Sequence, residues 1–181
     1  MKNQIEKICI SGIMLALSSV LSLIKIPFGP LGGSITLLSM IPVSLLGIWY
    51  GFGFALLPCV IYGVIQLFLD GFLSWGLTPL ILVGSLFFDY IFAFGILSVS
   101  GVFRNKKGGR IWGVALGCFG RFICHFISGL IFFRTFDVFS SPVLYSLVYN
   151  GGYMLPELIL TTAGVYALQK FGVIDRAVKR K

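Results

Sequence analysis

Charged residues are scarce in this chain of 181 residues, where they make up 11% of the total and only six are Asp or Glu. A soluble domain carries about 25% charged residues, so the composition excludes an ordinary soluble protein. Most of the chain consists of apolar runs, with 57% hydrophobic residues and a mean hydropathy of +1.00. We therefore expect residues 1–181 to form a single integral membrane domain.

The sequence also lacks the motifs that bind nucleotides and metals. It contains no Walker A, GxGxxG or HExxH pattern, so nothing in it indicates that the chain hydrolyses ATP. One histidine and scattered carboxylates make a poor metal site, and no cofactor is expected. The four cysteines lie in apolar stretches without a CxxC pair, which indicates packing residues. No basic surface interleaved with aromatic residues is present, so nucleic acid is not an expected partner.

Six apolar stretches approach the roughly 20 residues that a spanning helix needs. They cover residues 7–26, 35–50, 52–70, 79–103, 111–133 and 142–169. The second is the weakest prediction, because it is short and contains Pro42. The fold class predicted from this pattern is an all-α membrane protein with six transmembrane helices.

The basic residues predict the orientation of these helices. With six spans, one side of the membrane receives Lys2, Lys7, Arg104, Lys106, Lys107, Arg110, Lys170, Arg176, Lys179, Arg180 and Lys181. Only Lys25 and Arg134 fall on the other side. Cytoplasmic loops carry the excess of Lys and Arg, so both termini are predicted to be cytoplasmic. The net charge of +8 is interpreted as this orientation signal beside anionic lipid.

Five polar residues stand in stretches apolar enough to lie in lipid, namely Asp89, Arg121, His125, Asn150 and Glu157. An ionisable group at a helix centre costs roughly 2.5–3.5 kcal/mol on insertion scales, so these side chains should gather around something polar. At 1.5 Å per residue, Asp89, His125 and Asn150 lie roughly 12–15 Å below the outer ends of three different helices. Their common depth predicts a pocket that opens to the outside.

Asp89 has two interpretations on this pattern: a carboxylate that pairs with Arg121 to hold two helices together, or a ligand contact. Arg121 and His125 are four residues apart and share a helix face. We expect Arg121 to neutralise Asp89 or Glu157 rather than touch a ligand. For His125 a ligand contact is favoured over packing. Abundant aromatic residues beside a carboxylate would suit a flat, cationic, heteroaromatic ligand.

Several short motifs follow one another along the chain. They are Gly32-Gly33-Ser34-Ile35-Thr36, Asp89-Tyr90, Arg121-Phe122-x-x-His125-Phe126-Ile127-Ser128-Gly129 and Tyr145-Ser146-Leu147-x-Tyr149-Asn150. Together, in this order and at this spacing, they resemble the ThiT/YuaJ family. That family supplies the thiamine-binding S components of energy-coupling factor (ECF) transporters in the bacterial plasma membrane.

The resemblance implies a thiamine site near the outer face of a six-helix, multi-pass membrane protein. The residues that match the family's binding positions are Asp89, Tyr90, His125, Phe133, Tyr145 and Asn150. Phe133 stands where a tryptophan is often found, and phenylalanine offers a weaker cation–π face. Some members carry a tryptophan in the first outer loop, and this loop has none. Whether the loop contacts the ligand as a lid is therefore not predicted.

The resemblance also implies a partner. S components dock on an ECF module, a membrane coupling subunit driven by two ATPases, through small residues of the first helix. Gly12 and Ala16 are four residues apart there and would allow close helix contact. Packing within this chain's own bundle is an equal alternative for them. The Gly113 and Gly117 pair is expected to be used internally.

The sequence therefore predicts a non-enzymatic S component that binds thiamine. An S component for a thiamine precursor or another vitamin is the alternative within transport. A small intramembrane enzyme with Asp89 and His125 as acid and base is disfavoured, since no nucleophile–base pair accompanies them. A channel would line its full depth with polar residues, whereas the inner half of this sequence is mostly apolar.

Overall fold

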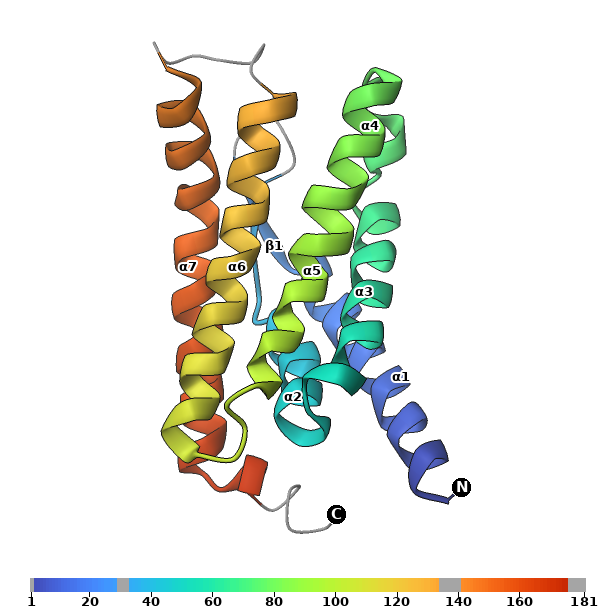
Figure 1. Cartoon of the computed structure of the whole chain (residues 1–181), viewed down its shortest axis with the longest axis vertical. Helices are drawn as coiled ribbons and strands as arrows, with labels where there is room; N and C mark the ends of the chain where they lie inside the picture. Colours follow the sequence, from blue (N-terminus) through green and yellow to red (C-terminus); the bar gives the residue numbers. More distant parts are fainter. Residues whose placement is uncertain (1, 29–32, 134–140, 176–181) are drawn as a thin grey trace.

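The computed structural model describes residues 2–28, 33–133 and 141–175. Helices of very different lengths stand side by side around the centre of the molecule (Figure 1). The α-helices are α1 (Lys2–Leu23), α2 (Met40–Tyr50), α3 (Phe52–Leu69), α4 (Pro79–Ser85), α5 (Ala93–Gly95), α6 (Lys107–Phe132) and α7 (Pro142–Lys170). The other elements are strands β1 (Lys25–Pro27) and β2 (Ser34–Thr36), 3₁₀ helices η1 (Phe72–Ser74) and η3 (Ile96–Gly101), and the π-helix η2 (Leu86–Phe92).

Four helical segments are long and apolar enough to cross a membrane: Gln4–Leu23, Phe52–Leu69, Pro79–Gly101 and Lys107–Phe132. They correspond to the first, third, fourth and fifth predicted spans. The fourth runs through α4, η2, α5 and η3 as one continuous rod (Figure 1). Helix α7 has 29 residues and extends over the sixth predicted span. The helical fold class is thus confirmed, and the count of six spans stays a prediction.

The second predicted span, residues 35–50, is wrong in its first part. Residues Ser34–Thr36 form β2, which pairs antiparallel with β1 in the register Lys25 with Thr36. The helix begins only at Met40, because the backbone groups before it are engaged in this hairpin. The resulting α2 has 11 residues, about 16 Å at 1.5 Å each, against a hydrocarbon core of about 30 Å. Residues Met40–Ile48 are all buried, so neighbouring helices surround α2.

The start of α1 and the end of α7 lie at the same end of the molecule (Figure 1). At that end Arg110, in the first turn of α6, donates to Asp175 at 2.6 Å. Lys107 lies 3.3 Å from the same carboxylate. The Arg110 guanidinium holds the pKa of the Asp175 carboxyl below its usual range. The cytoplasmic location of this end stays a prediction, and Arg134 and residues 176–181 lie outside the described residues.

Helices α6 and η3 approach each other closely at two glycines. A Cβ atom at Gly113 would lie 2.9 Å from the carbonyl oxygen of Ser100, and one at Gly117 would lie 3.3 Å from the Cα atom of Leu97. Both glycines are buried. Their predicted internal use is therefore confirmed.

We expect Gly113→Leu to lower the free energy of unfolding by about 1–3 kcal/mol, because the added side chain meets backbone that cannot turn away. Thermal unfolding of the detergent-purified protein measures this effect. Gly108→Leu is the matched control, since a Cβ atom there meets nothing within 4 Å. Equal unfolding temperatures for the two variants would contradict the close approach of α6 and η3.

Candidate functional site

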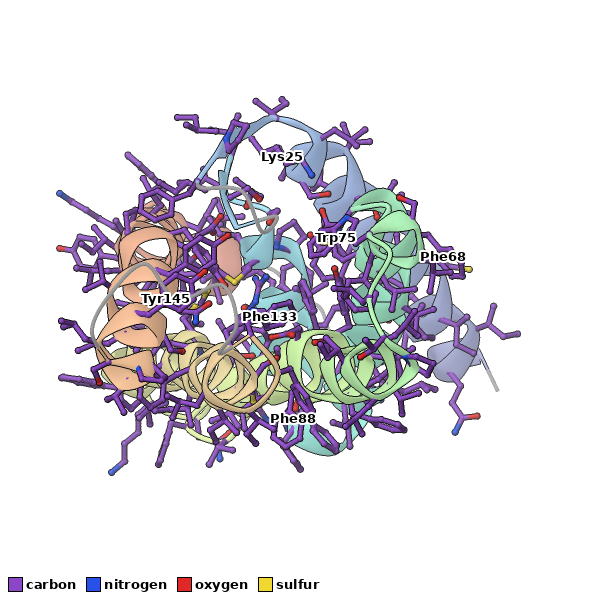
Figure 2. The ribbon with its side chains drawn as sticks, turned by 90° about the horizontal axis from the view of Figure 1, so that it is seen from above. Lys25, Phe68, Trp75, Phe88, Phe133 and Tyr145 are labelled. Carbon is purple, nitrogen blue, oxygen red and sulfur yellow. The ribbon has the colours of Figure 1, made fainter. Side chains whose placement is uncertain are left out.

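A cavity of about 90 Å³ lies between the helices, in the half of the molecule opposite the chain ends. One enclosed water needs roughly 10–15 Å³, so the cavity has room for a larger guest. Its walls come from α1, α3, η2, α6 and α7 and from both strands. Figure 2 shows Phe133 near the middle of the ring of helices, whereas Phe68 and Phe88 lie at the periphery.

All six residues that the sequence predicted for a binding site line this cavity. They are Asp89, Tyr90, His125, Phe133, Tyr145 and Asn150. The rise per residue along each helix predicted that Asp89, His125 and Asn150 lie at a common depth. In the structure they line one cavity and come from η2, α6 and α7. Their role as ligand contacts stays a prediction.

Asp89 is held by two side chains of α6. His125 Nδ1 lies 2.8 Å from Oδ1 of Asp89, and Ser128 Oγ donates to Oδ2 at 2.5 Å. On the other side of the imidazole, Arg121 Nε donates to His125 Nε2 at 3.2 Å. Because Nε2 accepts, the proton belongs on Nδ1, and His125 donates it to Asp89 as a neutral ring. The three residues thus form one chain of hydrogen bonds from Arg121 to Asp89.

Of the two interpretations of Asp89, a direct ion pair with Arg121 is wrong. Arg121 lies one helical turn deeper than His125, so the imidazole stands between the two charges. The guanidinium instead lies 4.0 Å from the ring centroid of Phe94 and 2.9 Å from the sulfur of Met40. No ion pair joins Arg121 to Glu157 either, among the residues that the structure describes. Arg121 lines the cavity itself.

The π-helix η2 carries Asp89 and Tyr90. A π turn holds more residues than an α turn, so consecutive side chains diverge less, and here both neighbours reach the cavity wall. Single π turns within α-helices are rare and occur frequently at functional sites. No feature of the sequence predicts this change of helix type, and both α3 and α6 pack against the segment.

Asn150 ties α7 to α6. Its Nδ2 donates to the backbone oxygens of Ser146 at 3.0 Å and His125 at 3.2 Å, and its Oδ1 accepts from Tyr153 at 2.8 Å. With these bonds its amide is fixed in orientation at the cavity wall. Tyr145 stacks on Tyr149 with ring centroids 5.7 Å apart and an interplanar angle of 15°. Aromatic faces therefore line the cavity on the α7 side.

A polar seam that was not predicted from the sequence lies between the end of α1 and α3. Tyr62 donates to the backbone oxygen of Ser18 at 3.2 Å, and Gln66 donates to Ser22 at 2.9 Å. One turn further, Lys25 pairs with Asp70 at 3.0 Å. The sequence signal for this wall is a four-residue spacing of polar side chains in an otherwise apolar stretch, at Tyr62, Gln66 and Asp70.

The charges of the lining sum to one negative unit. Two cations, Lys25 and Arg121, face three carboxylates, Asp70, Asp89 and Glu157, and His125 is neutral. A cavity with this formal charge favours a monocation over a neutral or anionic guest. In the described ranges, no three His, Cys, Asp or Glu side chains are grouped as metal ligands.

The small residues Gly12 and Ala16 of α1 face away from the bundle. Gly12 and Ala16 are both exposed, and a Cβ atom at Gly12 would meet nothing within 4 Å. The alternative that they pack inside this chain's own bundle is therefore wrong. This face of α1 is available to another helix.

Known proteins similar to this chain are transporters of one vitamin. Residues 8–173 match the family model described as thiamine transporter protein (Thia_YuaJ). The thiamine transporter ThiT of Bacillus subtilis (strain 168) is 30% identical over an alignment of 174 positions, and the match covers 87% of this chain and 87% of that protein. The solved structure of ThiT from Listeria monocytogenes superposes with a TM-score of 0.76 at 25% identity, over 93% of this chain and 96% of that one. From these matches and the shared fold, the chain belongs to the Thia_YuaJ thiamine transporter family.

Proposed function

We propose that this protein binds thiamine in the cavity and acts as the substrate-binding S subunit of an ATP-driven ECF importer. The observation that carries the proposal is the half-buried chain of hydrogen bonds Arg121–His125–Asp89, which ends at a carboxylate on the cavity wall. Ionisable groups in membrane-spanning helices are rare, and those that face a cavity mark substrate or ion sites. Family membership supports thiamine as the guest.

Thiamine joins an aminopyrimidine ring to a cationic thiazolium ring, and the cavity offers a partner for each property. A carboxylate such as Asp89 accepts hydrogen bonds from the amino group or faces the cation. The aromatic faces of Phe133 and Tyr145 suit flat rings, and a phenylalanine stacks on a cation less strongly than a tryptophan. The net charge of the lining complements a single positive charge.

The cavity is proposed to open outward. Phe133 and Tyr145 stand at the end of α6 and the start of α7, which lie opposite the start of α1 and the end of α7 (Figure 1). With the basic end cytoplasmic, as the positive-inside rule requires, this half of the molecule faces the exterior. Thiamine would then enter from outside the cell.

Energy for uptake is proposed to come from ATPase subunits of the ECF module, since the sequence itself contains no nucleotide-binding motif. The exposed small residues Gly12 and Ala16 on α1 are the proposed contact with the coupling subunit of the ECF module. Small side chains allow two helices to approach closely in lipid.

We expect the detergent-purified protein to bind one thiamine per chain, with quenching of tryptophan fluorescence because Trp75 lines the cavity. Isothermal titration calorimetry measures the affinity and stoichiometry. A thiamine precursor and an unrelated vitamin such as riboflavin are titrated alongside. Saturation by one of these but not by thiamine would reject thiamine as the ligand and support the alternative S-component assignment.

A further inference from the structure

Glu157 stands on the cavity wall formed by α7 and is 2% exposed. Its two carboxylate oxygens have different surroundings. Oε1 accepts from both the backbone N–H and the Oγ1 hydroxyl of Thr36, the latter at 2.6 Å. Thr36 is the last residue of β2, so this oxygen fastens the hairpin to α7.

The second oxygen, Oε2, has no hydrogen-bond partner in the described part of the chain, although it is buried. An unmade hydrogen bond at a buried acceptor is costly, and more so for a carboxylate. One oxygen would suffice to hold Thr36, and an amide side chain would supply it without a charge. The carboxylate is therefore more than the hairpin requires.

We propose that Glu157 is a second ligand-binding carboxylate, whose Oε2 accepts a hydrogen bond from an N–H or O–H donor of the bound vitamin. This inference rests on the proposed function, because it takes thiamine as the guest. Thiamine carries two donor groups at opposite ends, the amino group on the pyrimidine and the hydroxyl on the ethyl side chain. The cavity carries two carboxylates on different helices, Asp89 on η2 and Glu157 on α7. Each donor end then has one carboxylate, with the cationic ring between them.

This arrangement would make Glu157 a specificity-determining residue. A ligand with a donor at that end satisfies Oε2, whereas a ligand with only acceptors there leaves two acceptors facing each other in a buried site. Through Thr36, the same carboxylate also joins an occupied cavity to the hairpin. The contribution of Glu157 to ligand selectivity is measured with thiamine analogues, each of which lacks one of the two donor groups.

The test compares wild type with Glu157→Gln against three ligands. These are thiamine, the analogue whose ethyl hydroxyl is replaced by hydrogen, and the analogue whose pyrimidine amino group is replaced by an oxo group. Glutamine can keep its oxygen toward Thr36 while it places an NH₂ donor where Oε2 was. We expect a loss of about 10- to 100-fold in thiamine affinity, the effect of one hydrogen bond to a charged group.

The diagnostic result is that the loss shrinks to about threefold or less for one of the two analogues, because that analogue lacks the donor that Oε2 accepts. Thr36→Val is the control, since it removes a hydrogen bond to Oε1 and leaves Oε2 unchanged. Its effect should be the same for all three ligands. Should Glu157→Gln fail to fold, the same comparison is made with Glu157→Asp, which keeps the charge and withdraws it from the cavity.

Equal losses for all three ligands would overturn the proposal and leave Glu157 as an anchor of the hairpin only. Unchanged thiamine affinity in Glu157→Gln would overturn it as well. Failure of the wild-type protein to bind thiamine is a different result, because it rejects the proposed function before the variant is considered.

Discussion

Asp89→Asn is expected to weaken thiamine binding by about 2–5 kcal/mol, which is roughly 30-fold to several thousandfold in the dissociation constant. The carboxylate accepts from two donors, Ser128 and His125, and still reaches the cavity. Asparagine offers a single acceptor oxygen, and its NH₂ group must face one of these donors or the ligand. It also removes a negative charge that faces the cationic guest. His125→Ala should act in the same direction, since it takes away the donor that orients Asp89.

The matched control for this change is Asp175→Asn, which has the same chemistry at the opposite end of the molecule, beside Arg110. Calorimetric titration of both variants with thiamine, after gel filtration shows each to be folded, makes the comparison. Lys25→Ala is a second reference, because Lys25 is one-third exposed and paired with Asp70, and should cost less. A folded Asp89→Asn protein that binds thiamine like wild type would place the binding site outside this cavity.

Gly12→Trp and Ala16→Trp are expected to abolish thiamine uptake while leaving thiamine binding intact. Both residues are exposed on α1, and neither lines the cavity. A tryptophan there prevents the close helix contact that small residues permit, so the coupling subunit is held away. Uptake is measured in cells or proteoliposomes that contain the ATPase module, and binding is measured on the purified variants.

Gly53→Trp on α3 is the matched control for steric bulk, because Gly53 is exposed and a Cβ atom there meets nothing within 4 Å. It should retain uptake. Uptake at the wild-type rate in either α1 variant would reject this face as the docking surface. Robust uptake by the reconstituted chain without any ATPase partner would reject the S-subunit assignment and support a secondary carrier.

Much of the site was predictable because the position of a residue along a transmembrane helix determines its depth in the membrane. Asp89, His125 and Asn150 lie in different helices, yet a fixed rise per residue placed them at one level, and one cavity contains them. Family membership then confirms the prediction of a multi-pass membrane protein with a transport role rather than an enzymatic one. The resemblance to the ThiT/YuaJ family is confirmed by the same match.

The errors arose where neighbours in space decide the outcome. Depth alone could not say that His125 would stand between Arg121 and Asp89, because the direction of each side chain depends on helix packing. Asp70 ends the predicted span 52–70 and was assigned no role, yet the structure pairs it with Lys25 at the cavity wall. The early part of residues 35–50 reads as apolar helix, yet its backbone pairs with β1. Residues 29–32 of the first outer loop lie outside the described residues, so its use as a lid stays open.

The enclosure of α2 has a consequence for the biogenesis of the protein. Its 11 residues are too short to be recognised and released into lipid as an independent segment. It contacts α1, α3, η3 and α7, and the last two are synthesised long after it. Until they arrive, the apolar surface of α2 has only α1 and α3 beside it. Packing around α2 is therefore completed only after the first helices have been inserted, and a chain truncated before η3 should expose α2 to quality-control proteases although α1 and α3 are already in place.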